Sequence, residues 1–115
     1  TIEALLPNLQ AAQGARIAIM SSIMASDARA PGGSYIYRAS KAAVLNLGRN
    51  LAMDLRPIGI SVGSYHPGWV RTEMGGGGAD IDVQTSASGL IDRFAALSLE
   101  TTGCFEDYAG RAIPF

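Results

Sequence analysis

The sequence has one cysteine, one histidine and one lysine in 115 residues; its other eight basic residues are arginines. The single cysteine, Cys104, excludes an internal disulfide, so a reducing, cytoplasmic location is expected. One histidine and one cysteine are too few soft ligands for a structural metal site, and we expect no metal. No apolar run is long enough to span a bilayer. The formal net charge of −1 gives no electrostatic reason to expect a nucleic acid or an anionic membrane as partner.

The residues that are present describe a globular protein. The composition is 48% apolar and 17% charged, and the length suffices for one domain with a hydrophobic core over residues 1–115. The chain begins "TIEALLPNLQ", with neither an initiating methionine nor a capping signal. We therefore expect the natural polypeptide to be longer than this sequence.

Hydrophobic periodicity predicts two helices and one buried strand in the first half of the chain. Apolar residues at helical spacing predict a helix over residues 2–13, and the short apolar run at 17–20 predicts a buried strand. Residues 23–34 have the serine, proline and glycine content of a loop. The longest helical pattern runs from 35 to 55, with an expected inner face of Ala39, Ala42, Ala43, Leu47, Leu51 and Leu55.

The second half repeats this alternation. Residues 60–65 predict another buried strand, followed by a glycine-rich loop at 73–82. Asp82 can cap a helix over about 83–97, and the closing segment 103–115 predicts a short strand and a turn. The expected inner residues of this helix include Ile91, Phe94, Ala95 and Leu97.

Buried strands that alternate with helices predict the α/β class, with a parallel sheet and right-handed crossovers. Three strands make a small sheet. The first strand is expected to leave a flat apolar edge unless something pairs with it, which again favours a longer natural chain.

Tyr37 and Lys41 form the most informative pair in the sequence. In a helix they lie one turn apart on the same face. An unperturbed phenol has a pKa of about 10, and lowering it by two or three units needs about 3–4 kcal/mol. A cation about 5 Å away supplies roughly that amount at an effective dielectric near 20. The spacing therefore permits proton transfer near neutral pH.

Two serines, Ser21 and Ser22, follow the first predicted strand. The carboxyl ends of parallel strands are where α/β sheets bind ligands. A hydroxyl at this position could hold a carbonyl oxygen while the phenol of Tyr37 protonates it. The segments "RIAIMSSIMAS", "YRASKAAVLNLGRNLAMDL" and "SVGSYHPGWVRTEM" together resemble the short-chain dehydrogenase/reductase superfamily, closest in wording to its C-factor and sniffer-like carbonyl reductases.

This resemblance implies the C-terminal half of a Rossmann-like, doubly wound sheet, with the N-terminal βαβ half absent. It implies hydride transfer between NAD or NADP and a small carbonyl or alcohol substrate. Tyr37 is then the acid/base, Lys41 its assistant and Ser22 the group that orients the carbonyl, with Ser21 a minor alternative. A homodimer through helix 35–55 is also implied. The implied cofactor-binding residues are Tyr37, Lys41, Pro67, Gly68, Val70 and Thr72.

The sequence departs from the family pattern in one large respect. The glycine-rich phosphate loop, the residue that selects NAD or NADP and the family's catalytic asparagine would all precede Thr1. The run "GGGG" at 75–78 resembles a phosphate loop only in composition, and a substrate lid or hinge is the expected role of this segment.

Four further residues have more than one reading. Tyr35 is expected to line a pocket or to pack, Trp69 to wall the substrate pocket or to pack under the lid, and Met74 to contact substrate. His66 is expected to be a structural histidine, hydrogen-bonded near the end of the sheet, rather than a catalytic one.

The leading hypothesis is an NAD(P)-dependent oxidoreductase that needs the missing N-terminal half. Two alternatives stay open: a non-catalytic signalling or scaffold protein with this fold, and an inactive fragment that needs another chain.

Overall fold

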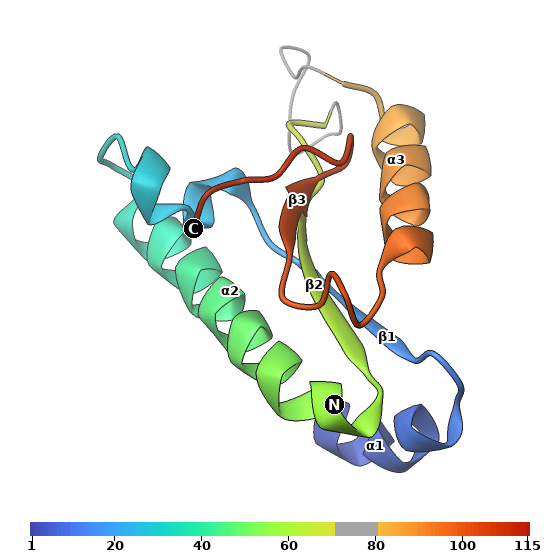
Figure 1. The fold of residues 1–115 in the computed structure, drawn as a ribbon. Helices are drawn as coiled ribbons and strands as arrows, with labels where there is room; N and C mark the ends of the chain where they lie inside the picture. Colours follow the sequence, from blue (N-terminus) through green and yellow to red (C-terminus); the bar gives the residue numbers. More distant parts are fainter. Residues whose placement is uncertain (71–80) are drawn as a thin grey trace.

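The computed structural model describes residues 1–70 and 81–115. Within them, helices and strands alternate along the chain (Figure 1), as the sequence predicts. The elements are α1 Ile2–Ala11, β1 Arg16–Met20, η1 Ile23–Ala25, η2 Asp27–Arg29, α2 Tyr35–Leu55, η3 Arg56–Ile58, β2 Ser61–His66, α3 Val83–Ala96 and β3 Phe105–Asp107, where η denotes a short 3₁₀ helix.

The three strands form one open parallel sheet in the order β1-β2-β3. Arg16 of β1 pairs with Ser61 of β2, and Ser64 of β2 pairs with Phe105 of β3. The predicted parallel α/β sheet is therefore confirmed. β1 lies at one edge and alternates along its length between exposed and half-buried residues, so its outer face is open. Met20 on that face is 42% exposed.

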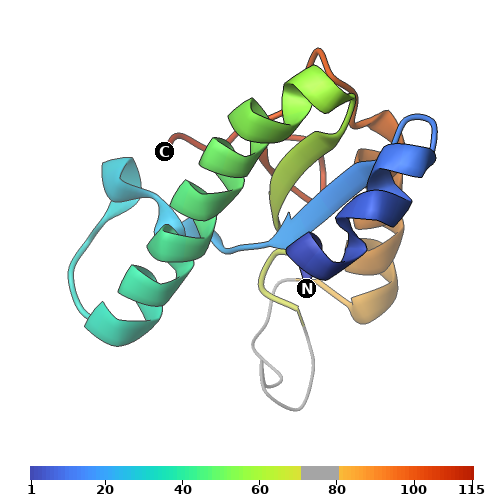
Figure 2. The same cartoon turned by 90° about the horizontal axis from the view of Figure 1, so that it is seen from below.

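Helices cover both faces of the sheet (Figure 2). α1 and α2 pack on one face and α3 on the other. Under α1 and α2 lies an apolar cluster with Ala15, Ala52, Leu55, Ile60 and Val62 at its centre. On the opposite face, the rings of Tyr65 and Phe94 meet edge to face with centroids 5.1 Å apart.

The position of α2 depends on Gly48. A Cβ atom at this residue would lie 2.8 Å from Oγ of Ser64 and 2.9 Å from Cδ1 of Ile19. Only a residue without a side chain lets the helix approach the sheet this closely. α2 therefore packs closely against side chains of β1 and β2.

The predicted inner faces of α2 and α3 are only partly right. Leu47 is 56% exposed and Ile91 is 64% exposed, and Ala39, Ala43 and Ala95 are exposed as well, so these five predictions are wrong. In each helix apolar residues occupy more than one face, and helical spacing alone does not say which row meets the sheet. The buried residues are Leu45, Gly48, Ala52 and Leu55 in α2, and Ser86 and Leu90 in α3.

The start of α3 follows the predicted capping pattern. An Oδ1 atom of Asp82 accepts a hydrogen bond of 2.7 Å from the Thr85 backbone amide. Within residues 1–70 and 81–115, no helix has the length and apolar character needed to cross a membrane.

Candidate active site

The carboxyl ends of the three strands meet around one cavity of about 660 Å³. Ser22 follows β1, Gly68 follows β2 and Asp107 ends β3, so each strand delivers a residue to the same place. Cavities of this size and position accommodate small molecules. The cavity is lined by Ser22, Ile23, Met24, Arg29, Tyr37, His66, Gly68, Trp69, Ile81, Asp107, Tyr108, Arg111, Ala112 and Ile113.

Ser22 is buried at the floor of this region and caps the short helix η1. Its Oγ accepts a hydrogen bond of 3.1 Å from the Met24 backbone amide. That bond uses an oxygen lone pair and leaves the hydroxyl hydrogen available for donation. The neighbouring Ser21 is also buried, and its Oγ has no hydrogen-bond partner within residues 1–70 and 81–115, but Ser21 does not line the cavity.

Tyr37 reaches the cavity from the first turn of α2. Its side chain is 47% exposed, and Nζ of Lys41 lies 5.7 Å from the centre of its ring. Lys41 itself does not line the cavity and is half-buried behind the phenol. The structure thus brings Ser22 and Tyr37 together at one cavity, with Lys41 one helical turn along.

The segment after β2 makes the turn that the sequence predicts as a cofactor cradle. The Pro67 carbonyl accepts a 2.6 Å hydrogen bond from Ser86 Oγ of α3, which fixes the segment to that helix. Gly68 has a φ of +86°, a left-handed conformation that glycine adopts without strain. Val70 pairs with Ile81 in a short parallel bridge. Trp69 lines the cavity and is 55% exposed.

Of the other predicted site residues, two fall outside the part of the chain that the structure describes, and one lies away from the cavity. Thr72 and Met74 lie outside the described residues, as does the glycine run 75–78. Tyr35 is 81% exposed at the start of α2 and does not line the cavity.

His66 is half-buried at the end of β2 and lines the cavity. Its Nδ1 atom has no hydrogen-bond partner among residues 1–70 and 81–115, so the prediction of a hydrogen-bonded histidine is wrong at this atom. Burial lowers the pKa of His66, and the Asp107 carboxylate opposes that effect. The imidazole is therefore neutral at pH 7 and can form a hydrogen bond with a neutral polar group.

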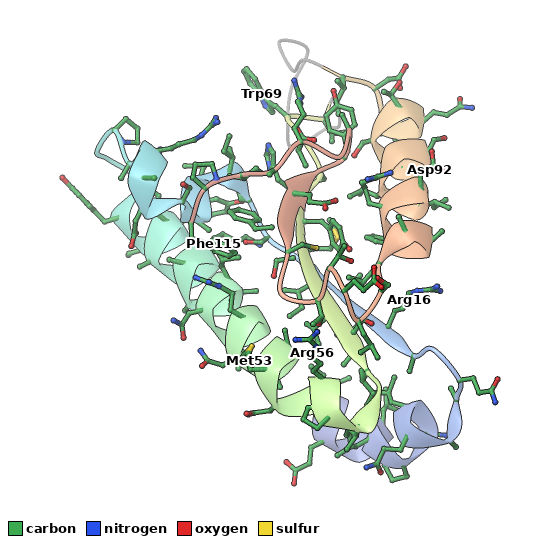
Figure 3. All side chains as sticks on the ribbon, viewed as in Figure 1. Arg16, Met53, Arg56, Trp69, Asp92 and Phe115 are labelled. Atoms are coloured by element: carbon green, nitrogen blue, oxygen red, sulfur yellow. The ribbon has the colours of Figure 1, made fainter. Side chains whose placement is uncertain are left out.

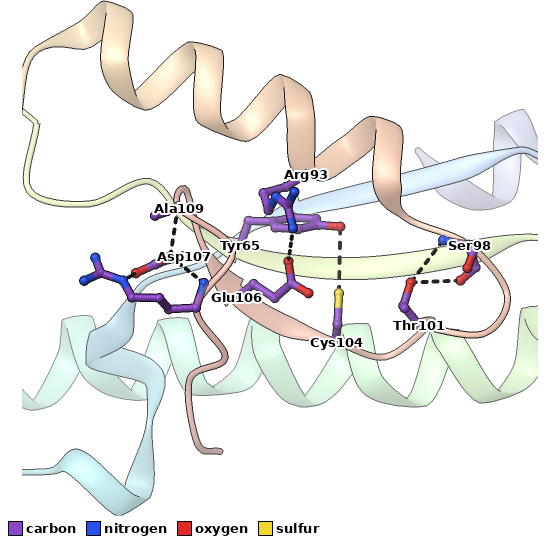
Figure 4. A network of polar contacts seen from close by, with 9 residues as sticks. Tyr65, Arg93, Ser98, Thr101, Cys104, Glu106, Asp107 and Ala109 are labelled. Carbon is purple, nitrogen blue, oxygen red and sulfur yellow. Dashed lines mark hydrogen bonds and ion pairs between the residues drawn. The ribbon is translucent and has the colours of Figure 1, made fainter.

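Asp107 closes the end of β3 with a tight turn (Figure 4). One carboxylate oxygen accepts hydrogen bonds of 2.9 Å from the Ala109 and Arg111 backbone amides, and the other accepts one of 2.7 Å from Nε of Arg111. Burial by itself would raise the pKa of Asp107, but these hydrogen bonds hold it below the ordinary value. The carboxylate is fully engaged in shaping the turn.

A second tyrosine near the sheet end, Tyr65, is unsuited to proton transfer. Its hydroxyl accepts a long contact of 3.8 Å from Sγ of Cys104, and its ring is buried against α3 (Figure 4). Burial raises the pKa of Tyr65 well above the ordinary value of a phenol, and the Cys104 thiol adds to that effect. Tyr37 lines the cavity instead, as does Tyr108, which follows β3.

Two arginines in the cavity lining are absent from the sequence predictions. Arg29 ends η2, and Arg111 follows the Asp107 turn near the C-terminus. Neither belongs to a recognisable motif, and the two are distant in sequence. Only the return of the C-terminal segment along β3, where Ile113 donates to the Phe105 carbonyl, brings Arg111 to the site.

Sequence comparisons match this chain to one family model and to several similar proteins. A family model described as short chain dehydrogenase matches residues 1–80. The chain is 40% identical over 113 residues to C-signal of Myxococcus xanthus, covering 97% of this chain and 68% of that protein. It is 38% identical to 1-hydroxy-2-glutathionyl-2-methyl-3-butene dehydrogenase of a Rhodococcus species, covering 96% of this chain and 50% of that protein.

Solved structures give the same result for the fold. Carbonyl reductase Sniffer of D. melanogaster superposes with a TM-score of 0.91 at 34% identity, over 99% of this chain and 51% of that one. An NADPH-bound carbonyl reductase from chicken fatty liver gives 0.88 at 33% identity, over 99% and 51%. A Pseudomonas aeruginosa carbonyl reductase in complex with NADP gives 0.80 at 36% identity, over 99% and 49%. The chain spans about half the length of these proteins.

Proposed function

Because this chain belongs to the short-chain dehydrogenase family, we propose that it forms the catalytic part of an NAD(P)-dependent carbonyl reductase. The observation that carries the proposal is the shared cavity at the strand ends, lined by both Ser22 and Tyr37. The TM-score of 0.91 with a carbonyl reductase supports the same reaction class.

The chain's own residues fit the nicotinamide end of such a cofactor. Tyr37, Gly68 and Trp69 line the cavity, Lys41 lies beside the Tyr37 ring, and NADPH- and NADP-bound carbonyl reductases superpose over 99% of this chain. The choice between NAD and NADP is left open by these residues. When bound, the cofactor supplies or accepts a hydride.

Proton transfer and orientation fall to two side chains. The hydroxyl hydrogen of Ser22, free because Met24 donates to its oxygen, hydrogen-bonds the substrate carbonyl. Tyr37 gives its phenolic proton to the same oxygen as the carbonyl carbon is reduced. The Lys41 cation, 5.7 Å from the ring, stabilises the phenolate that remains.

A direct test is NADH and NADPH oxidation by the natural-length protein with a panel of aldehydes and ketones. We expect turnover, and we expect Tyr37→Phe to abolish it while cofactor binding persists. Substantial turnover by the Tyr37→Phe variant would overturn the role of this tyrosine. No turnover on the whole panel, with cofactor bound, would favour the second candidate below.

The second candidate function is non-catalytic signalling. The specific observation in its favour is the 40% identity to a protein named C-signal, over 97% of this chain. Under this hypothesis the fold and the cofactor site serve as a binding module. Retained biological activity in a Tyr37→Phe protein would support it.

We also propose that α2 forms a homodimer surface. Ile36 and Leu47 are 88% and 56% exposed and, eleven positions apart, share one face of this helix. Met53, labelled in Figure 3, is 68% exposed on another face. Exposed apolar rows of this kind are typical of helix-to-helix interfaces. Sedimentation of the natural-length protein should show a dimer, and Leu47→Glu should yield a monomer that keeps its melting temperature.

A further inference from the structure

We propose that the substrate of this site is a carbonyl compound whose apolar body ends in a carboxylate, which Arg111 binds with help from Arg29. The inference deepens the proposed function and rests on it for the carbonyl. Its own basis is the charge and the hydrogen-bonding state of the cavity lining.

The charge of the cavity lining differs from that of the whole chain. The chain has a formal net charge of −1, yet among residues 1–70 and 81–115 the lining contains two arginines and a single carboxylate. His66 adds no charge near neutrality. The cavity thus has a local positive excess, opposite in sign to the whole chain. Such an excess beside an apolar cavity favours an anionic ligand.

The side-chain nitrogens of Arg111 are only partly used by contacts among the described residues. Nε of Arg111 donates to Asp107 over 2.7 Å, while its Nη1 and Nη2 atoms have no hydrogen-bond partner among residues 1–70 and 81–115. An arginine anchored at Nε and open at both terminal nitrogens is oriented for a two-point bond to a carboxylate. The backbone amide of Arg29 donates to the Ser26 carbonyl, but its side chain has no hydrogen bond or ion pair within those ranges, so its guanidinium is free for the same ligand.

Asp107 is the carboxylate that competes with a ligand for Arg111. Within the described residues, the hydrogen bonds that its carboxylate accepts come from its own turn, and its side chain is 10% exposed against 72% for Arg111. Asp107 therefore binds Arg111 at Nε and not at its terminal nitrogens. A bound carboxylate can approach the exposed side without displacing it.

The cavity lining combines polar and apolar groups. It includes the hydroxyls of Ser22 and Tyr37 and the guanidinium of Arg111. It also includes Ile23, Ile81 and Ile113, whose side chains are apolar. A ligand that combines a carbonyl, methylene groups and a carboxylate matches this composition.

The test compares 6-oxohexanoate with its methyl ester as substrates of the natural-length protein. The acid and the ester share the aldehyde and the chain, and differ in charge. We expect kcat/KM for the acid to exceed that for the ester, and Arg111→Gln to lower it about 10- to 100-fold for the acid alone. Arg29→Gln, which breaks no described contact, should lower it less and with the same selectivity. Arg111→Lys should recover part of the loss.

Arg56→Gln is the matched control. Arg56 lies in η3 before β2, while Trp69 of the cavity follows β2, so the two are at opposite ends of the strand (Figure 3). This variant should leave both substrates unchanged. Equal losses for the acid and the ester in Arg111→Gln, or no preference for the acid in the unaltered protein, would overturn the inference.

Binding measurements distinguish a failure of the proposed reductase function from a failure of the carboxylate site. Trp69 is the only tryptophan of the sequence and lines the cavity, so its fluorescence reports occupancy without turnover. If neither compound is reduced but the acid titrates this fluorescence more tightly than the ester, and Arg111→Gln removes the difference, the carboxylate site stands and the reductase does not. Equal titrations by the acid and the ester would overturn the carboxylate site.

Discussion

The two ends of the central strand β2 differ sharply in chemistry. At its amino end, Ile60 just before the strand and Val62 within it are both fully buried, in an apolar cluster under α1 and α2. Its carboxyl end leads to His66, an open cavity and a turn held by a buried carboxylate. The same six-residue strand thus connects a region of dense packing with a region of unpaired polar groups.

This difference separates stability from chemistry along one strand. Apolar burial at the amino end stabilises the sheet. At the carboxyl end, Nδ1 of His66 and Oγ of Ser21 have no hydrogen-bond partner within residues 1–70 and 81–115 and contribute no such stabilisation, because buried polar groups without partners are unfavourable. Changes at the two ends should therefore be separable by experiment.

The largest expected effect is on turnover. Tyr37→Phe removes the proposed proton donor, and kcat should fall about 100- to 10,000-fold, the usual contribution of general acid–base catalysis. Because the side chain is half exposed, the unfolding midpoint in urea should stay unchanged. A parallel fall in stability would mean that the two ends are not separable at this residue.

The matching change at the opposite end is Ile60→Ala. Removing a fully buried isoleucine side chain leaves a cavity and should lower the free energy of unfolding by about 2–5 kcal/mol. Urea titration measures this loss. The kcat of the molecules that remain folded should be close to that of the unaltered protein, and a large loss of kcat in them would contradict the separation.

Lys41→Met should reduce kcat less than Tyr37→Phe does. A cation 5.7 Å from the phenol ring is worth up to about 3 kcal/mol at an effective dielectric near 20, and solvent at this half-exposed site reduces that. We expect a loss of about 10- to 100-fold in kcat. Arg49→Met, on the same helix but stacked on Phe115, serves as the control and should leave kcat unchanged.

The smallest effect should come from His66 and pH. Burial lowers its pKa in the folded state, so below the ordinary value of about 6.5 the unfolded chain binds a proton that the folded protein resists. Stability should therefore fall as pH decreases from 6.5 through the lowered folded-state pKa. His66→Gln should flatten this part of the pH profile in thermal melts, and an unaltered slope would show that His66 is not its source.

The amino-acid sequence predicts the order of helices and strands well, because the residues that define each element lie close together in the chain. The range 35–55 matches α2, and Asp82 caps α3, since helical periodicity and capping depend on neighbours within a few residues. The inner faces are less predictable. Leu47 and Ile91 point outward because the choice between two apolar rows is decided by the sheet, which lies elsewhere in the chain.

The candidate site likewise contains residues that the sequence predicts and residues that it does not. Ser22, Tyr37 and Gly68 belong to recognisable motifs, and all three line the cavity. Their catalytic roles stay predictions. Arg29, Arg111 and the Asp107 turn carry no motif, because their place at the cavity depends on how the C-terminal segment folds back. That contact is visible only in three dimensions.

The parallel register described above also governs the order of folding. The paired strands are consecutive in the chain, but each pair joins residues that are distant in sequence, such as Arg16 with Ser61 and Ser64 with Phe105. The bond from Arg16 Nε to the Leu97 carbonyl joins residues 81 positions apart. Chain entropy must be lost over long loops before such contacts form, so formation of the sheet is expected to be slow. The cavity has walls from all three strands and the C-terminal segment. It can exist only after both crossovers have closed, which makes the ligand site one of the last features of the molecule to appear.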